Sequence, residues 1–582
     1  MKEPALESGS GPQWTRFSTK FPSLLKDVPV MIAVMAVLYA LISLSHYWAG
    51  PVNTQPVIDL NPSALPKYAL FSISRLVVAY AFSLAIALVY AFVAAHNARA
   101  ERLLIPLLDT LQSIPVLSFL PPVMMAMIGL FPSSQLGVEL GSILLITTGQ
   151  VWNMIFSVYS STKNVPREMQ ESAQVYRLSW WQKYVQVELP FSAIGLIWNS
   201  MMSMAGGWFF LMACEMFVLG SRDLRLPGLG SYLQTAANAG STGAIVWGVA
   251  TMITVIVVID QAVWRPLIAW SEKFKFEQVE ASRTPRSPVL DLLRNSRVVR
   301  YAARAIGSPA GEALNRHFVL KTNRIATAQR NGRWIEWMRR GLLILVLAAL
   351  VYAAIRMGAM VARISGAELR SILLGASATF LRVEFVLVLA ALWTVPVGVA
   401  VGLRPRLAAF AQPIAQIAAS VPATALFPIV LLVLIRAGGG LGIGSIILLL
   451  LGTQWYLLFN IIAGASAIPT DLKEVCQVFR LSAAERWRKL LLPGIFPYLI
   501  TGFVTASGGA WNASIVAEYF RFKGQTITTV GLGSVISSAT DAGNFPVLLT
   551  ATIVMAAMVV TVNRLLWRKL YALASTRYSM NS

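Results

Sequence analysis

Long runs of apolar residues alternate with short polar segments along most of the chain. Each run has about 18 to 25 residues, the length that an α-helix needs to cross a hydrocarbon layer roughly 30 Å thick. Backbone groups inside a bilayer must bond within their own segment, so the runs should be helices. The pattern predicts twelve spans in two sets of six: near 29–49, 70–95, 104–130, 139–160, 192–219 and 243–268, then near 341–361, 373–402, 409–436, 442–464, 496–520 and 545–566.

The composition supports an all-α polytopic membrane protein. The chain has 582 residues, of which 56% are hydrophobic and 13% charged, and its mean hydropathy is +0.64. These values are too apolar for an ordinary soluble protein. The two cysteines and three histidines are scattered and have no metal-site or catalytic spacing. The sequence therefore predicts no metal site and no enzyme active site.

The charge pattern predicts the orientation in the membrane. The formal net charge is +22, and the excess Lys and Arg falls in segments that share one side if the N-terminus is cytosolic. We therefore place both termini in the cytosol and expect the bilayer, not nucleic acid, to explain the basic character. The first 28 residues contain no apolar core, so we expect a cytosolic tail rather than a cleaved signal peptide.

The second half of the chain repeats the first. An ungapped offset of 303 residues superposes Trp152 on Trp455 and also aligns two Gly-Leu-Gly-Ser segments, whereas an offset of 307 residues pairs Arg75 with Arg382 further upstream. Each repeat has an even number of spans, so both insert in the same orientation about an axis along the membrane normal. The predicted organisation is a cytosolic tail (1–28), a first transmembrane domain (29–268), a basic cytosolic linker (269–340), a second transmembrane domain (341–568) and a cytosolic tail (569–582).

One polar segment occurs in both repeats. It reads QESAQVYRLSWWQKYVQVELPF from Gln170 to Phe191 and KEVCQVFRLSAAERWRKLLLPG from Lys473 to Gly494, and half of the positions in 166–179 are identical in 469–482. By the span count both copies lie in the cytosol. Pro166 and Pro469 can open a short helix whose apolar positions offer a knob to a partner. We expect each Leu-Pro pair to end the segment and start the next span.

These segments resemble the EAA loop of ABC importer permeases, with the pattern E-A-A-x3-G-x9-I-x-L-P. The resemblance implies that they are coupling helices that dock on two cytosolic ATPase subunits. The family's glycine is Arg177 in the first copy and Arg480 in the second, which puts the usual turn geometry in question and suggests an acidic feature on the ATPase. The implied coupling residues are Glu171, Ala173, Arg177, Leu178, Leu189, Pro190, Glu474, Cys476, Arg480, Leu481, Leu492 and Pro493.

The resemblance covers most of each half. The segments beginning SRLVVAYAF and TFLRVEFVL look like the second and third spans of the nitrate, sulfonate, taurine and bicarbonate type of permease. That family implies two fused six-helix type I importer domains in a bacterial inner membrane, an extracytoplasmic solute-binding protein, and a small oxyanion or organosulfur cargo. ATP and Mg would bind the partner subunits, since the chain has no Walker A sequence and needs no cofactor of its own.

Charged residues inside spans mark candidate pathway or gate positions. These are Arg75 and Arg382 in the second spans and Glu215 and Glu518 in the fifth, with Trp208 and Trp511 one or more turns inward. Two interpretations remain open: buried ion pairs that fix helix packing, or groups that contact substrate. The small residues 205–207 and 508–510 permit close helix contact or line a narrow path. Prolines at 115, 121, 122, 422 and 428 are expected to break the third spans.

Two other classes of protein compete with the importer permease. A self-sufficient secondary active transporter can also have two parallel six-helix repeats. A membrane-embedded enzyme or scaffold would need clustered histidines or paired carboxylates within the spans, and the sequence shows none. The spans do not identify the transported solute.

Overall fold

The computed structural model describes residues 56–219, 222–274, 287–302, 332–522 and 525–577, together with single positions between 27 and 51 and between 304 and 316. The part described is helical apart from two short antiparallel hairpins. In the first half and linker the elements are η1 (Pro62–Ala64), α2 (Leu65–His96), α3 (Ala98–Ser113), η2 (Val116–Phe119), α4 (Leu120–Leu130), α5 (Leu136–Lys163), α6 (Arg167–Val175), α7 (Trp180–Lys183), η3 (Tyr184–Glu188), α8 (Leu189–Glu215), β1 (Val218–Leu219), β2 (Arg222–Asp223), α9 (Leu229–Asn238), α10 (Thr242–Ile259), η4 (Asp260–Trp264), α11 (Arg265–Ser271), η5 (Glu272–Phe274), α12 (Pro288–Asn295) and α13 (Arg297–Ala302).

The second half repeats this order, as the duplication predicts. After α15 (Gly332–Val361), each element matches one of the first half. They are α16 (Gly366–Gly402), α17 (Pro405–Ser420), α18 (Ala423–Arg436), α19 (Leu441–Ala467), α20 (Thr470–Val478), α21 (Ala483–Arg486), η7 (Trp487–Leu491), α22 (Leu492–Ala517), β3 (Tyr519–Phe522), β4 (Gln525–Thr528), α23 (Leu532–Ala542), α24 (Phe545–Val562), η8 (Asn563–Trp567) and α25 (Arg568–Arg577).

Eight of the described helices are long and apolar enough to cross a membrane, and the count rises to ten if each bent pair is one span. The prediction of twelve spans differs from this at two places. About half of the predicted span 29–49 falls outside the described residues, and in α15 the apolar stretch Leu347–Val361 is shorter than the other spans. The remaining predicted spans correspond to described helices or bent pairs.

The third predicted span of each half is bent sharply, at two of the five prolines expected to break it; Pro121 and Pro122 instead lie in the first turn of α4, and Pro428 lies inside α18 without a break. The helix axes change direction by 86° between α3 and the η2–α4 segment, and by 84° between α17 and α18. Pro115 and Pro422 lie in these breaks. A proline has no N–H to donate and disfavours helical geometry in the residue before it, so the break occurs there.

The Leu-Pro pairs do not end the preceding helix, which corrects the sequence-based expectation. Helical structure continues from Trp180 to Glu215, and likewise from Ala483 to Ala517. A π-helical turn precedes the Leu-Pro pair in each half, over Tyr184–Glu188 and Trp487–Leu491. The wider turn accommodates a proline that cannot donate to the regular ladder, so the helix passes through without stopping.

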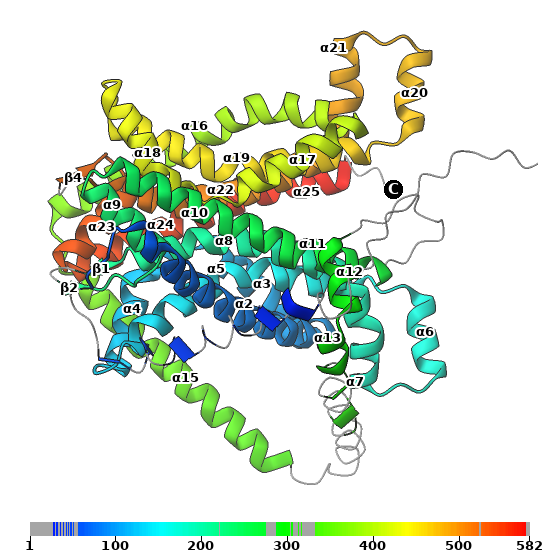
Figure 1. The fold of residues 1–582 in the computed structure, drawn as a ribbon, viewed down its shortest axis with the longest axis horizontal. Helices are drawn as coiled ribbons and strands as arrows, with labels where there is room; N and C mark the ends of the chain where they lie inside the picture. Colours follow the sequence, from blue (N-terminus) through cyan, green and yellow to red (C-terminus); the bar gives the residue numbers. More distant parts are fainter. Residues whose placement is uncertain are drawn as a thin grey trace, which may run out of the picture.

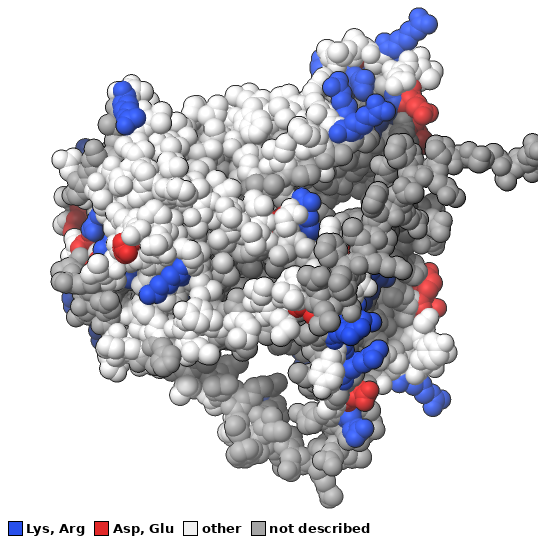
Figure 2. All heavy atoms as spheres, viewed as in Figure 1, with Lys and Arg blue, Asp and Glu red and all other residues white. Residues whose placement is uncertain are grey.

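Figure 1 shows α6, α7, α20 and α21 at one end of the helix bundle and both hairpins, with α9 and α23, at the other. We call these the loop end and the hairpin end. Three helices form the core of each half: α2, α5 and α8, and α16, α19 and α22. On the face seen in Figure 2, charged side chains gather mostly toward the two ends and leave a largely uncharged band between them. This distribution fits helices that cross a bilayer.

Candidate functional site

The two polar segments at the loop end fold alike. Each begins with a short helix, α6 or α20, after the predicted Pro166 or Pro469. Each short helix ends in a Schellman motif: in the first copy the Leu178 N–H donates to the Ala173 carbonyl at 3.0 Å and the Arg177 N–H donates to the Gln174 carbonyl at 2.9 Å. The second copy repeats both bonds, with lengths of 3.0 Å and 3.0 Å.

Arg177 and Arg480 occupy the position that favours glycine in such a motif. Their φ angles are +51° and +46°, in the left-handed region, and they are the only non-glycine residues with positive φ in the described part of the chain. A side chain in this conformation costs about 1 kcal/mol. The turn geometry that the missing glycine put in question is therefore present in both copies, at a cost in local strain.

The tips of these segments expose apolar side chains. Val175 and Tyr176 are 79% and 78% exposed, and the equivalent Val478 and Phe479 are 78% and 72% exposed. Among the other predicted coupling residues, Glu171, Arg177, Glu474 and Arg480 are also exposed, Ala173 and Cys476 are buried, and Leu178 and Leu481 are half-buried. Leu189, Pro190, Leu492 and Pro493 lie at the start of α8 and α22, in the continuous helices.

Arg75 lies at the centre of a fully buried charge cluster. Its guanidinium forms two bonds of 2.7 Å to Glu139 on α5, one of 2.8 Å to Glu215 at the end of α8, and one of 2.8 Å to the carbonyl of Pro227. Arg75 is 1% exposed and both carboxylates are 0% exposed. Glu139 lies in a predicted span and was not among the predicted site residues.

The second half builds the same cluster with one carboxylate fewer. Arg382 pairs with Glu518 and donates to the Val530 carbonyl at 3.0 Å. By the 303-residue offset, Gly442 stands where the first half has Glu139. The first cluster therefore holds two carboxylates against one guanidinium, and the second holds one against one. The sequence did contain a signal for Glu139: it is a charged residue inside a predicted span, and its counterpart in the repeat is uncharged.

The Gly-Leu-Gly-Ser segments contribute backbone N–H donors to these clusters. The Gly230 N–H donates to Glu215 at 2.7 Å, and the Gly533 N–H donates to Glu518 at 2.8 Å. Each glutamate thus accepts from the first turn of α9 or α23, where unpaired N–H groups and the helix dipole favour a negative charge. Buried hydroxyls complete the cradle: Ser72 donates to Glu215 and Thr379 to Glu518, both at 2.7 Å.

A cavity of about 430 Å³ lies between the halves, in the apolar part of the bundle. We call it the central cavity. One wall is α8 of the first half, and the others come from the second half. It is lined by Trp198, Met201, Met202, Ala205, Gly206, Phe209, Phe210, Gln412, Gln416, Ala419, Ser420, Val421, Pro422, Ala423, Leu451, Gly452, Trp455, Tyr456, Phe459, Ala463, Gly509, Asn512 and Ala513.

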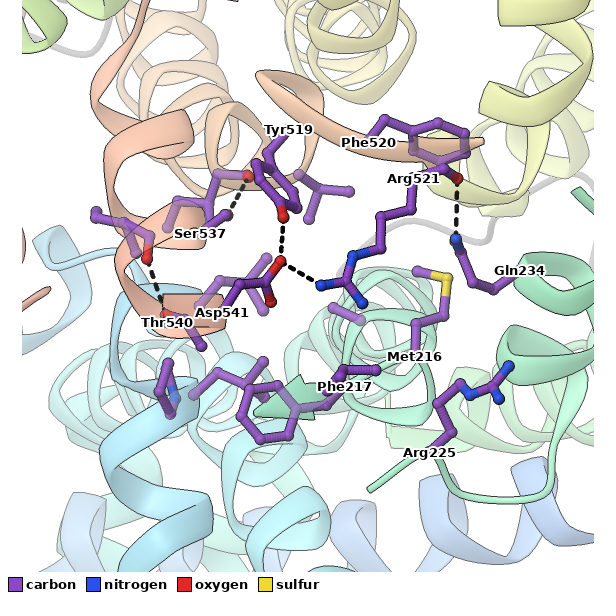
Figure 3. A pocket seen from close by; sticks show the side chains of 18 of the residues that line it. Met216, Phe217, Arg225, Gln234, Tyr519, Phe520, Arg521, Ser537, Thr540 and Asp541 are labelled. Carbon is purple, nitrogen blue, oxygen red and sulfur yellow. Dashed lines mark hydrogen bonds and ion pairs between the residues drawn. The ribbon is translucent and has the colours of Figure 1, made fainter. Parts of the chain in front are cut away.

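A second cavity, of about 470 Å³, lies at the hairpin end, and we call it the hairpin cavity. Figure 3 shows Tyr519, Arg521 and Asp541 joined on one side, with Arg225 on the other. Arg521 contacts Asp541 at 2.5 Å, and Arg225 contacts Asp223 at 2.5 Å. Burial lowers the pKa of Arg521, but the Asp541 carboxylate and the Tyr519 hydroxyl together outweigh burial, so this pKa lies above its usual value. Both arginines of this cavity are therefore charge-balanced.

The two cavities follow each other along α8 and α22. The hairpin cavity reaches Ala213 and Ile515, and the central cavity reaches Phe210 and Ala513, within about one helical turn. Between them the Leu117 N–H donates to the side-chain oxygen of Asn512 at 3.4 Å, across the two halves. The two cavities therefore lie in sequence between the halves, with the Leu117–Asn512 contact between η2 and α22 at their junction.

The predicted pathway residues do not line either cavity. Arg75 and Glu215 pair inside the first half and Arg382 and Glu518 inside the second, while Trp208 and Trp511 are 2% and 0% exposed in the core. The predicted small residues do reach the central cavity, at 205, 206 and 509. Sequence reasoning missed its aromatic lining, because aromatic residues occur throughout the spans.

Two tandem helical domains with paired polar loops at one end and a cavity between them define a duplicated, polytopic helical membrane protein. The family model for the binding-protein-dependent transport system inner membrane component matches residues 68–263 and again residues 394–568. These matches cover well over half of the chain. The chain therefore belongs to this family, with two of its domains fused, as the sequence resemblance predicts.

Curated relatives point to one branch of the family. The chain is 31% identical over 162 residues to a nitrate import permease protein of Synechococcus elongatus, covering 28% of this chain and 54% of that protein. It is 35% identical over 130 residues to a bicarbonate transport system permease protein of Synechocystis sp. (22% and 45%), and 27% identical over 166 residues to a taurine transport system permease protein of Escherichia coli (28% and 56%). The chain spans about half the length of these relatives.

Proposed function

We propose that the chain is the permease subunit of an ABC importer, which forms the path for a small solute and is driven by separate ATPase subunits. The observation that carries this proposal is the pair of matched loops at one end of the bundle, each with exposed apolar tips. Exposed apolar side chains on short helices are what a groove on a partner binds. Two related knobs require two related partner surfaces, hence two ATPase subunits.

Each loop is connected mechanically to the far end of its half. The continuous helix from Trp180 reaches Glu215, whose carboxylate is bonded to α9 and to Arg75 on α2. A displacement of α6 would therefore move α7, α8 and α9 together, as in a rigid-body transition. The buried ion pairs serve this mechanism by holding each half as one body, rather than by contacting the solute.

The remaining partners are proposed from the family to which the chain belongs. ATP and Mg would bind the ATPase subunits, and this chain would hold no cofactor and catalyse no bond chemistry. The loop end would face the cytosol together with both termini, and the hairpin end would receive solute from an extracytoplasmic binding protein. The names of the relatives favour an oxyanion or organosulfur cargo, and the lining of the central cavity bears on that choice below.

Reconstitution tests the proposal. The chain in proteoliposomes, with its two ATPase subunits and a solute-loaded binding protein, is expected to accumulate solute only when ATP and Mg are supplied on the loop side. Uptake by the chain alone in response to an ion gradient, with no effect of ATP, would instead identify a secondary active transporter and overturn the proposal.

A further inference from the structure

The wall of the central cavity is aromatic and carries no charge. Six of its side chains are aromatic, and three of them, Trp198, Phe209 and Phe210, lie on α8. Among the described residues that line it, none is Asp, Glu, Lys, Arg or His. An ion in such a place would lose its hydration and find no partner charge, which is costly. The electron-rich faces of aromatic rings add repulsion for an anion.

The aromatic wall is not inherited equally by the two halves. By the 303-residue offset, Trp198, Met202 and Phe209 of α8 correspond to Thr501, Thr505 and Asn512 of α22. On the facing helices, Tyr456 of α19 corresponds to Asn153 of α5. At these four positions the residue that lines the wall is apolar or aromatic and its repeat counterpart is polar, whereas Trp455 and Phe459 have the aromatic counterparts Trp152 and Phe156. Fusion of two domains in one chain permits this asymmetry, which two identical subunits could not have.

A few amides give the cavity hydrogen-bonding capacity. Gln412 and Gln416 of α17 line it, and the Gln416 amide nitrogen lies 2.8 Å from the sulfur of Met201 on α8. A thioether is a weak acceptor, so a carbonyl or ring nitrogen would be a better partner for this amide. An amide offers a donor and an acceptor side by side, which matches the edge of a flat heterocycle.

We infer that the central cavity binds a flat, uncharged aromatic or heteroaromatic solute, and that this is the cargo class of the permease. The inference rests on the proposed function. The cavity volume of about 430 Å³ suits an organic molecule with one or a few rings, and it far exceeds the volume of an anion such as nitrate. Ring stacking on the aromatic wall supplies affinity, and the amides of α17 supply orientation. A compact oxyanion would leave most of this volume unfilled, could not stack across the aromatic wall, and would meet no cationic side chain among the described lining residues.

Gly206 allows the cavity to be filled without disturbing the fold. It lines the cavity, and a Cβ built on it meets nothing within 4 Å. A Gly206→Trp side chain can therefore enter the open space. A Cβ built on Gly243, at the hairpin end of α10, also meets nothing within 4 Å, but Gly243 does not line the cavity. Gly243→Trp is therefore the matched control.

The test is ligand-observed NMR by saturation transfer, on the full chain with its ATPase subunits in nanodiscs. The probes are nicotinamide, adenine and cytosine, with nitrate, bicarbonate and taurine as competitors. We expect transfer to at least one heteroaromatic probe in wild type and in Gly243→Trp, and at least tenfold weaker binding in Gly206→Trp. Gln416→Leu should weaken binding by about fivefold, the effect of one hydrogen bond. Neither the two anions nor zwitterionic taurine should compete.

Several results would overturn the inference. These are the absence of cavity-dependent binding by every probe, displacement of the probes by nitrate, bicarbonate or taurine, or a phospholipid found in the cavity by mass spectrometry of the purified complex. The proposed function fails separately. If the probes bind as expected but no ATP-dependent uptake occurs, the importer is wrong; if ATP-dependent uptake survives Gly206→Trp unchanged, the importer stands and the cargo site is wrong.

Discussion

The carboxylate of Glu215 fills the space in which a side chain at Gly228 would have to begin. Glu518 and Gly531 repeat this relationship in the second half. The backbone of Gly228 is extended, so the glycine is needed for close approach and not for an unusual φ. The Gly-Leu-Gly-Ser segments and the span glutamates, which the sequence shows as separate features, form one device that ties the end of α8 to the start of α9.

Gly228→Ala is therefore expected to destabilise the protein strongly. The added methyl group would push Glu215 away from Arg75 and from the α9 amides, and disruption of a buried ion pair costs about 3–5 kcal/mol. Thermal unfolding of the purified chain in detergent measures the loss. Gly243→Ala, where a Cβ meets nothing within 4 Å, is the control. Equal unfolding temperatures for Gly228→Ala and wild type would show that the carboxylate is not held as described.

The two arginine clusters should respond differently to loss of their cation. Arg75→Met leaves two buried carboxylates without their guanidinium, whereas Arg382→Met leaves one, so Arg75→Met is expected to be the more destabilising. Each loss is about 3–5 kcal/mol or more. Adding Glu139→Gln to Arg75→Met removes one of the two charges and should restore about 1–3 kcal/mol.

A double-mutant cycle in thermal or denaturant unfolding measures this coupling. The matched comparison is Arg382→Met alone, since Gly442 already stands at the position of Glu139 in that half. Strict additivity of Arg75→Met and Glu139→Gln, with no recovery in the double variant, would contradict the paired geometry.

Arg177→Gly and Arg480→Gly should stabilise the turns after α6 and α20. Glycine adopts the left-handed conformation without strain, so each change is expected to gain about 1 kcal/mol locally. Hydrogen exchange of the amides at 176–178 and 479–481 should slow accordingly. If strained arginines persist because they bind an acidic surface of the ATPase, coupled uptake should fall in the same variants.

Arg177→Ala separates these two effects. It removes the charge but keeps a Cβ in the left-handed conformation, so it should lower coupling without stabilising the turn. Unchanged uptake in both the Gly and the Ala variants would show that the two cations do not take part in coupling.

Glu171→Ala combined with Glu474→Ala is expected to uncouple transport. Both carboxylates are exposed on the loop helices, so their loss should change the free energy of unfolding by no more than about 0.5 kcal/mol. ATP hydrolysis by the assembled complex should continue while uptake falls at least tenfold. Gln174→Ala with Gln477→Ala, at neighbouring exposed positions of the same helices, is the matched control, and full uptake in the glutamate variant would contradict a docking role.

Much of the architecture was predictable because it depends on local and repeated patterns. Hydropathy located most of the spans, Pro115 and Pro422 located the bends, and the repeat located the paired loops with Pro166 and Pro469 at their starts. A buried ion pair between Arg75 and Glu215 was one of two interpretations, the other being contact with substrate. The available signal was that the two residues lie at similar depths in their predicted spans. The path of the helix through Pro190 was not predictable, because a π-turn depends on how the surrounding helix adjusts its hydrogen bonds.

By itself, then, the amino-acid sequence determined a duplicated helical membrane protein with two matched polar loops. The lengths of the apolar runs and the similarity of the two halves can be read without knowing which residues are in contact. Only the tertiary structure decided that Glu139 joins Arg75, that Gly228 makes room for Glu215, and that Trp198 and Gln416 meet in one cavity. The physical reason is that side chains from distant segments come together through the rotation and crossing of packed helices, and apolar spans carry almost no periodic signal of which face turns inward.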